Sequence, residues 1–486
     1  MADPLDQPAD GLAALERVAA EAEAYLDSLA NGPVRLARSD EAAAAFDGPL
    51  PDEGLGTLGA LDRLIEGGLD AHVRSSGPRF FHWVMGGATP AALGADWLTS
   101  LLDQNAGGWD ASPLAARLEL LSLRWLRELF GLPSDWDGVL VTGGQMANFS
   151  GLAAARQWWG ERHGVDVSAD GLADLPQAPV LTSGFVHVTA LKALAMLGLG
   201  RGRLKICADG GGAMDLAALA HELQALAGAP SIVIGNAGEV NTGLFDPLEE
   251  IADLCDEFGA WLHIDGAFGL FARVSPRTAG LAAGVERAHS VIADGHKWLN
   301  VPFDCGFAFV RDRELLGRTF AAGAAYLPEA SEDHPIFAFR APELSRRARS
   351  LAVWATLAAY GRSGYRAIVE RCLDNAARLA AQVESAEDFE LLAPVPLNVV
   401  CFRYRPAGAT EPELDDLNQR IGEAVLTDGR IYAGTTCWKG KVAFRPAFVN
   451  WRTTSNDVDL ILETLRDLGA RSRASRAPGR PRPHGA

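Results

Sequence analysis

Two short apolar runs, each leading into a charged residue, constrain this chain more than any other feature. Residues 260–264 have the length of a buried strand and end at Asp265, and residues 290–293 lead into the segment DGHKW, which contains Lys297. A third run, residues 306–310, follows after a turn. In open α/β sheets, ligands bind beyond the carboxyl ends of the strands. The pattern therefore predicts an aspartate and a lysine at one binding edge of a sheet.

Asp265 and Lys297 together suit a particular chemistry. A lysine amine can form a Schiff base with an aldehyde cofactor. An aspartate can pair with a pyridinium nitrogen and keep it protonated, which makes the ring an electron sink. Enzymes that use pyridoxal phosphate (PLP) divide the work in this way. Because Asp and Lys are usually ordinary surface charges, the choice depends on the sequence around them.

The surrounding sequence resembles a known family. The words HIDGAFG, HKWL and DCGFAFV resemble those of the group II PLP-dependent amino-acid decarboxylases, which include the aromatic-amino-acid, histidine and glutamate decarboxylases. Farther along, PELSRRARSLAVW resembles the same family, and the resemblance extends over roughly residues 75–465. It implies that Lys297 holds PLP as a Schiff base and that Asp265 pairs with the pyridinium nitrogen.

A turn with two glycines is the candidate phosphate site. Residues 138–141 are predicted to form a strand that runs through TGGQMAN into a helix. Glycines between a strand and a helix let the backbone approach an anion, and the helix N-terminus supplies free N–H groups and a positive dipole. A tight turn without a ligand has the same pattern. The resemblance implies that Gly144 and Gln145, together with His296, hold the PLP phosphate.

The resemblance implies further cofactor contacts. His187 stands where the family places a histidine flat against the cofactor ring, although its position before a helix also suits a cap. Ala267 follows Asp265 closely and is expected to contact the cofactor. Asn241 stands where a hydroxyl residue is common and is expected to replace its contact. Asp294 stands where Asn is common, and because a second anion beside a phosphate is unfavourable, we expect it to orient His296.

The order of predicted elements indicates an α/β protein. Strand and helix patterns alternate from residue 114 to 310, which implies a mostly parallel sheet covered by helices on both faces. The resemblance implies the fold-type I PLP-dependent transferase fold, with a large PLP-binding domain at 106–362. A long helix is predicted to begin near residue 343, and residues 363–468 are predicted to form a small α+β domain with a strand at 430–434 among its elements.

Both ends of the chain are predicted to lie outside these domains. Residues 1–105 form a helical segment with amphipathic helices near 11–30 and 58–73, and such helices must pack on another surface because they cannot form a core alone. The resemblance implies that they clasp the partner of a homodimer. Residues 469–486 are basic and rich in Pro, Gly and Ser, so we expect a disordered tail.

Composition disfavours several classes of function. The net charge of −18 predicts a surface that repels nucleic acid and anionic membranes. No apolar run reaches the length of a membrane span. The six cysteines lack metal-ligand spacing, so we expect buried free thiols and no metal site. The N-terminus is unlike a signal peptide, and a cytoplasmic location is expected.

The predicted reaction is the decarboxylation of an L-amino acid to an amine and CO2, which makes the chain a carboxy-lyase. Phe81 and Trp83 lie in an aromatic loop and favour an aromatic or apolar substrate, although such a cluster also suits core packing. One alternative is an aminotransferase, in which an arginine such as Arg445 would bind the substrate carboxylate. Another is a non-catalytic protein with the PLP fold.

A third alternative concerns the proton that is returned after CO2 leaves. In the resembled family a mobile loop carries a tyrosine that donates it. That loop corresponds here to residues 326–342, and Phe339 occupies the tyrosine's place. Phenylalanine has no proton to donate, and relatives with Phe at this point can act as aldehyde synthases that release aldehyde, ammonia and hydrogen peroxide. Donation by Tyr326, His334 or water would preserve simple decarboxylation.

Overall fold

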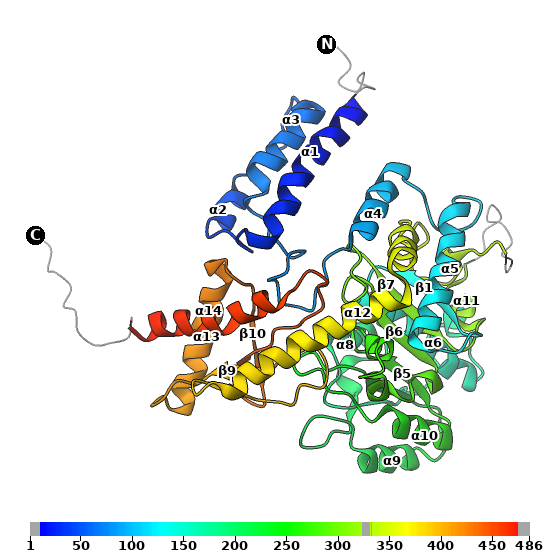
Figure 1. Ribbon diagram of the computed structural model, residues 1–486. Helices are drawn as coiled ribbons and strands as arrows, with labels where there is room; N and C mark the ends of the chain where they lie inside the picture. The colour runs from blue at the N-terminus through cyan, green and yellow to red at the C-terminus, as the bar shows by residue number, and fades with distance from the viewer. Residues whose placement is uncertain (1–9, 323–330, 332, 475–486) are drawn as a thin grey trace, which may run out of the picture.

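A seven-stranded sheet forms the centre of the computed structural model, which describes residues 10–322, 331 and 333–474 (Figure 1). The strand order is β1-β7-β6-β5-β4-β2-β3. The bounds are Asp137–Val141 (β1), Val180–Thr182 (β2), Lys205–Ile206 (β3), Ile232–Asn236 (β4), Trp261–Asp265 (β5), Ser290–Asp294 (β6) and Gly306–Val310 (β7). Strand β7 pairs antiparallel with both of its neighbours, and the other pairs are parallel. The predicted α/β fold with a mostly parallel sheet is confirmed.

Helices cover this sheet and continue into both ends of the chain. Their bounds are Asp10–Asn31 (α1), Ser39–Ala44 (α2), Gly56–Arg63 (α3), Pro90–Leu102 (α4), Pro113–Phe130 (α5), Gly144–Arg162 (α6), Val167–Asp170 (α7), Val188–Met196 (α8), Leu216–Ala225 (α9), Leu248–Phe258 (α10), Leu315–Phe320 (α11), Ser350–Ser385 (α12), Glu411–Asp428 (α13) and Ser455–Ala474 (α14). Helix α6 packs on β6 and β7, and α10 packs on β4 and β5. All strands of the sheet except β3 are buried along their full length. This burial on both faces explains why the sequence shows continuous apolar runs there.

A second, antiparallel sheet belongs to the C-terminal part. Its order is β10-β11-β9-β8, with bounds Phe389–Leu391 (β8), Phe402–Tyr404 (β9), Thr435–Trp438 (β10) and Lys441–Phe444 (β11). Residues 430–434, predicted as a strand, make only an isolated bridge between Tyr432 and Phe80. The neighbouring β10 takes the place in the sheet instead. Residues 469–474 continue α14, so the predicted disorder is wrong for them, and residues 475–486 lie outside the described part.

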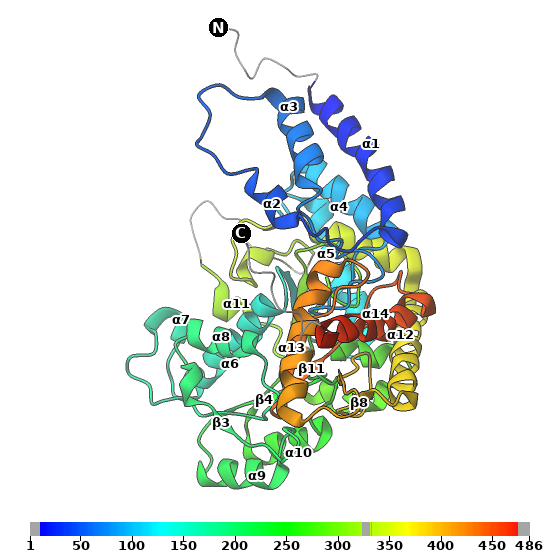
Figure 2. The same ribbon diagram turned by 90° about the vertical axis from the view of Figure 1, so that its left-hand side faces the viewer.

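The N-terminal helices stand apart from the rest of the molecule. Helices α1 and α3 pack against each other and project from the body, as Figure 1 and Figure 2 show. The predicted helix at 58–73 is shorter than expected. Helix α3 gives way to a single π-helical turn at Leu64–Gly68, where the poor helix formers Gly67 and Gly68 stand together. Within the described residues, no helix is both long and apolar enough to cross a membrane.

The PELSRRAR motif is held by ion pairs rather than by a helix. Helix α12 begins at Ser350, not near residue 343 as the sequence suggested. Ahead of it, Arg346 makes a buried pair with Glu119 at 2.8 Å, Arg347 pairs with Asp96 at 2.7 Å, and Arg349 pairs with Asp304 at 2.7 Å. These pairs bind the motif to three other segments of the chain. Helix α12 itself is kinked at Gly361, next to our proposed domain boundary at 362.

Candidate active site

Asp265 and Lys297 lie at the carboxyl edge of two adjacent strands. Asp265 is the last residue of β5, and Lys297 follows the end of β6 by three residues. The two strands pair in parallel, with Asp265 opposite Ile292. Asp265 is 5% exposed, and the side chain of Lys297 is 16% exposed. The edge that the sequence predicted is therefore where these two residues lie.

The backbone around Lys297 is fixed from several sides. The Asn300 side chain donates to the carbonyls of Trp298 at 2.8 Å and Val449 at 2.9 Å, which ties this loop to the C-terminal part of the chain. On another side, the Gly86 N–H donates to the His296 carbonyl at 3.0 Å. A Cβ on Gly86 would overlap the Lys297 carbonyl oxygen, so only glycine permits this approach. The loop that carries Trp83 is thus pressed against the lysine.

Asp294 is the charged partner of Lys297. Its Oδ2 lies 3.1 Å from Lys297 Nζ, and its side chain is 4% exposed. Its Oδ1 accepts the Gly144 N–H and lies 3.4 Å from His296 Nε2. The expected contact with His296 is therefore present. The pairing with Lys297, three residues along the chain, was not predicted. Nor was the bond to the N-terminus of α6, which joins residues 150 positions apart.

The N-terminus of α6 has the character of an anion site. Gln145 Nε2 and His296 Nδ1 are buried there without a hydrogen-bond partner in the described part of the chain. A Cβ on Gly143 would lie 2.8 Å from the His296 ring, so the two glycines keep the space between helix and histidine narrow. Unpaired donors at a helix N-terminus suit a phosphate. The residues present therefore fit the phosphate of PLP.

The Asp265 carboxylate is held by two N–H donors. Asn148 Nδ2 donates to Oδ2 at 2.8 Å, and the Ala267 backbone N–H donates to Oδ1 at 3.2 Å. Ala267 is also close to the second strand end, since its carbonyl accepts the Asp294 N–H at 2.8 Å. The sequence analysis did not single out Asn148. The one feature that could have indicated a site residue is its polar side chain on an otherwise small and apolar stretch of helix, one turn after Gly144.

His187 joins the same cluster. It is the N-cap of α8, and its Nδ1 lies 2.8 Å from Thr189 Oγ1 and accepts the Thr189 backbone N–H at 3.4 Å. Burial lowers the pKa of His187. The charged groups that act on it are Asp265, Lys297, Arg445 and Asp294. His187 therefore borders the space in which Asp265 and Lys297 lie.

Two predicted contacts are placed elsewhere. Asn241 Nδ2 donates to Glu239 at 2.6 Å, and its Oδ1 accepts from Thr436 at 2.7 Å, so its side chain joins the two sheets. These bonds disfavour the cofactor contact that we expected of Asn241. Phe81 is 1% exposed and packs on Phe448 at 5.4 Å, so it belongs to the core. Trp83 in the same loop is 59% exposed and remains the aromatic candidate.

Phe339 does not meet Lys297 within one chain. The next residue, Arg340, pairs with Asp137 at 2.7 Å, and Asp137 begins β1. The turn to Gly144 follows the other end of β1, which four steps of about 3.3 Å place about 13 Å away. A reaction role for Phe339 within its own chain is therefore not supported. Tyr326 lies outside the described residues, and His334 stacks on Trp109 at 4.5 Å.

Arg445 borders the same space. Its Nη1 donates to the Val240 carbonyl at 3.3 Å. Burial lowers the pKa of Arg445, while Glu239 acts in the opposite direction. The described residues contain no group of three or more His, Cys, Asp or Glu side chains arranged to hold a metal ion. Five cysteines are buried free thiols as expected, whereas Cys437 is exposed.

Comparisons with known proteins agree with this geometry. A family model described as the pyridoxal-dependent decarboxylase conserved domain matches residues 51–405. An aromatic-L-amino-acid decarboxylase of Bacillus atrophaeus is 31% identical over 403 residues, which are 80% of this chain and 81% of that protein. An L-2,4-diaminobutyrate decarboxylase of Rhizobium meliloti is 33% identical over 435 residues, with 86% and 84% covered. The solved structure of Oryza sativa TDC with PLP and tryptamine has a TM-score of 0.87 at 25% identity, covering 97% of this chain and 99% of that one.

Proposed function

This chain belongs to the pyridoxal-dependent decarboxylase family, and from that premise we propose which residues carry the reaction and which substrate it takes. The chain is a PLP-dependent amino-acid decarboxylase, a carboxy-lyase. Its relatives give no support to the aminotransferase or to the non-catalytic alternative. The observation that carries our assignment of residues is the convergence of Lys297, Asp265 and His187 beside the unpaired donors of Gln145 and His296.

Each of these groups receives a distinct role. Lys297 Nζ would bind the cofactor aldehyde, and Asp265 would accept a hydrogen bond from the pyridinium nitrogen. When bound, PLP supplies a sink for the electron pair that CO2 leaves behind. The side chains of Gln145 and His296 would hold the phosphate beside Gly144 at the N-terminus of α6, and Ala267 would line the ring.

His187 contributes by position as well as by hydrogen bonding. Its ring would stack on the cofactor ring and restrain its tilt. A ring nitrogen directed toward the substrate carboxylate donates a hydrogen bond and helps to hold the breaking bond in a productive orientation.

We propose an aromatic L-amino acid as substrate. Trp83 is largely exposed within one chain, and its loop contacts the backbone at His296 and Lys297. A side chain of this kind stacks favourably on an aromatic ring. The relative from Bacillus atrophaeus is named for aromatic substrates. Small amine side chains, as in the Rhizobium relative, would leave the face of Trp83 uncovered.

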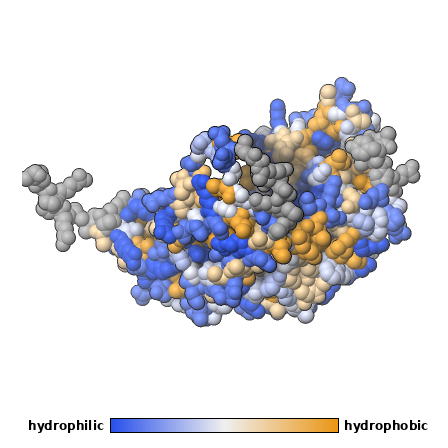
Figure 3. Space-filling model, turned by 90° about the horizontal axis from the view of Figure 1, so that it is seen from above, coloured by the Kyte–Doolittle hydropathy of each residue, from blue (hydrophilic) through white to orange (hydrophobic). Residues whose placement is uncertain are grey.

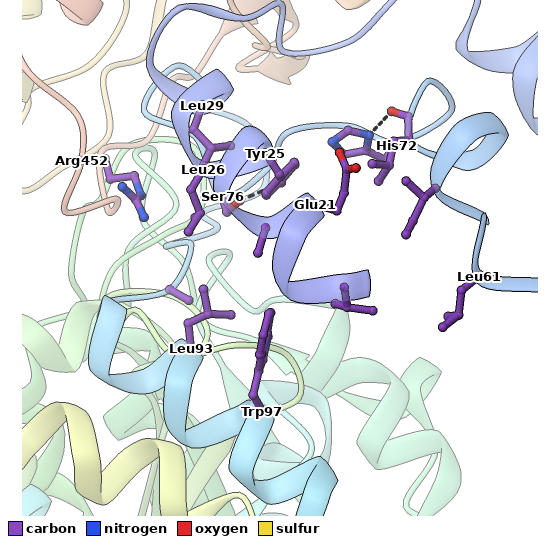
Figure 4. Close-up of a pocket in the computed structure, with 15 residues that line it drawn as sticks. Glu21, Tyr25, Leu26, Leu29, Leu61, His72, Ser76, Leu93, Trp97 and Arg452 are labelled. Carbon is purple, nitrogen blue, oxygen red and sulfur yellow. Dashed lines mark hydrogen bonds between the residues drawn. The ribbon is translucent and has the colours of Figure 1, made fainter. Parts of the chain in front are cut away.

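We propose that the enzyme is a homodimer in the cytoplasm. A cavity of about 460 Å³ lies between α1, α3 and α4 and is mostly apolar (Figure 4). On α4, Leu98, Leu101 and Leu102 are 45%, 61% and 41% exposed. Figure 3 shows hydrophobic side chains exposed on the side that carries the N-terminal helices. A second copy would bury this surface, because contiguous apolar patches of this kind mark interaction sites.

Chemical trapping tests the cofactor assignment directly. Borohydride reduction of the PLP-loaded protein, followed by peptide mass spectrometry, should place the adduct on Lys297. The Lys297→Ala variant should give no adduct and no turnover. An adduct on another lysine would overturn the assignment.

Amine and CO2 should form from aromatic amino acids in preference to diaminobutyrate, and the reverse preference would overturn the proposed substrate.

A further inference from the structure

A chain of buried hydrogen bonds connects Asp265 with His187. It runs from Trp261 through Ser290, His263 and Asn148 to Thr189, and its distances are 3.1, 2.8, 2.9 and 3.1 Å in that order. Ser290, His263 and Asn148 are 0% exposed. Because these side chains are shielded from solvent, each of their polar atoms must donate to or accept from another atom in this series of hydrogen bonds. The direction of every bond can therefore be deduced.

The amide of Asn148 determines the first direction. A carboxylate only accepts, so the Asn148 group 2.8 Å from Asp265 must be the NH2. The second hydrogen of that NH2 points to Thr189 Oγ1 at 3.1 Å. Asn148 Oδ1 then accepts from His263 Nε2 at 2.9 Å. One amide thus serves Asp265 and Thr189 simultaneously.

The same bonds suit His263 as a neutral imidazole. In a neutral ring whose Nε2 donates to Asn148, Nδ1 accepts from the Ser290 hydroxyl at 2.8 Å. The Ser290 oxygen is in turn free to accept the Trp261 indole N–H at 3.1 Å. Burial lowers the pKa of His263 to about 4, which agrees with a neutral ring. The amide of Asn148 therefore cannot flip by 180° without breaking three hydrogen bonds, those with Asp265, Thr189 and His263.

The chain ends by setting the tautomer of His187. The Thr189 backbone N–H points to His187 Nδ1 at 3.4 Å, and because a backbone N–H only donates, Nδ1 is the acceptor. Thr189 Oγ1 accepts from Asn148 and lies 2.8 Å from the same nitrogen, so its own hydrogen is available as a second donor to Nδ1. The proton of the neutral His187 ring is therefore on Nε2.

We infer that Asn148 and Thr189 are positioning residues for decarboxylation: they couple Asp265 to His187 and hold His187 as the Nε2–H tautomer. This inference rests on the proposed role of His187 toward the substrate carboxylate. An Nε2–H group attracts a carboxylate, whereas a lone pair at the same place repels it. Helix α6, whose N-terminus is the proposed phosphate site, thus also orients the His187 ring through Asn148.

Thr189→Val tests the inference, with Thr189→Ser as its matched control. Valine has nearly the shape of threonine but cannot donate from its side chain, whereas serine keeps the hydroxyl. We expect Thr189→Val to lower kcat/KM by up to about tenfold, since a hydrogen bond between neutral groups contributes up to about that factor. We expect Thr189→Ser to retain most of the wild-type value. Both variants are measured after PLP loading has been verified by visible absorption.

The pH profile separates positioning from a merely structural role. A donor to Nδ1 favours the neutral ring, so its loss raises the pKa of His187 and moves the acid limb of kcat/KM upward by about half a unit or more. The charged groups that face His187, namely Asp265, Lys297, Asp294 and Arg445, are unchanged in both variants. A Thr189→Val enzyme with wild-type kcat/KM, or with a lower value on an unshifted profile, would overturn the inference.

A readout without turnover keeps the inference distinct from the proposed function. Nitrogen-15 NMR of histidine-labelled holoenzyme, assigned with a His187→Gln variant, reports which ring nitrogen is protonated. We expect an Nε2–H signal in the wild type and in Thr189→Ser, and a mixture of tautomers in Thr189→Val. An Nδ1–H signal in the wild type would refute the deduced chain of bonds. Absence of amine production by a protein with the expected NMR signals would instead count against the proposed function.

Discussion

Asp294→Asn should bind PLP more tightly than the wild type. The substitution preserves shape, and the remaining Oδ1 can still accept the Gly144 N–H. What is lost is a negative charge at the N-terminus of α6, where the cofactor phosphate is proposed to bind. Two effects then act in the same direction. The cofactor-free enzyme loses its Asp294–Lys297 ion pair, and the loaded enzyme loses a repulsion between two anions.

The magnitude follows from the ion pair. At the observed 3.1 Å, two unit charges attract by about 5 kcal/mol at an effective dielectric of 20 and by about 1.3 kcal/mol at that of water. The two side chains are only 16% and 4% exposed, and desolvation offsets part of the attraction. We therefore take the lower figure, which corresponds to about a tenfold decrease in Kd. The relief of repulsion adds to this decrease.

The assay is a titration of cofactor-free enzyme with PLP, followed by visible absorption and by quenching of tryptophan fluorescence. Asp312→Asn provides a control, since that carboxylate pairs with Arg318 at 2.7 Å beyond the end of β7. The control should leave the Kd unchanged. A Kd for Asp294→Asn that equals or exceeds the wild-type value would refute the idea that Asp294 competes with the phosphate.

Three further predictions concern assembly, product and stability. Sedimentation should show a dimer at micromolar concentration, and Leu101→Glu, which places a charge on the exposed face of α4, should yield monomer; an active wild-type monomer would contradict this. Under air we expect amine from the wild type and from Phe339→Tyr, whereas aldehyde with peroxide that decreases in the tyrosine variant would establish the oxidative alternative. Arg346→Met should lower the free energy of unfolding by about 3–5 kcal/mol, because it leaves Glu119 buried without a partner. Arg347→Met should cost less than about 1 kcal/mol in the same denaturant titration, since its ion pair is partly exposed; equal losses would contradict the argument from burial.

Local pattern was sufficient for much of the fold. The strand ends at Asp265 and near Lys297 could be predicted from apolar runs of strand length. A strand that is buried on both faces of a sheet needs a continuous apolar run, so the run marks the strand. The same reasoning failed for residues 430–434, which are as apolar as the real strand β10 that follows them. Pairing partners decide between two such runs, and they are not visible in either run alone.

For the candidate site residues, too, local sequence revealed some features and tertiary contacts decided the others. Resemblance to family motifs predicted Lys297, Asp265 and His187, which lie on short segments with their own signature. It also suggested Asn241, but Thr436, 195 positions away, engages that side chain. The family resemblance could not account for that contact, because no residue near Asn241 in the sequence indicates it.

The sequence by itself determined the order of strands and helices, the family, and the loops that carry the cofactor chemistry, because all of these depend on residues near one another in the chain. Only the tertiary structure decided the contact of Asp294 with the N-terminus of α6, the attachment of the segment that carries Phe339 to the start of β1, and the set of hydrogen bonds that joins Asp265 to His187. Asn148 contacts Asp265 across 117 positions and Thr189 across 41. Hydrogen-bond direction depends on which groups meet after folding, and those meetings are set by the packing of whole helices on the sheet.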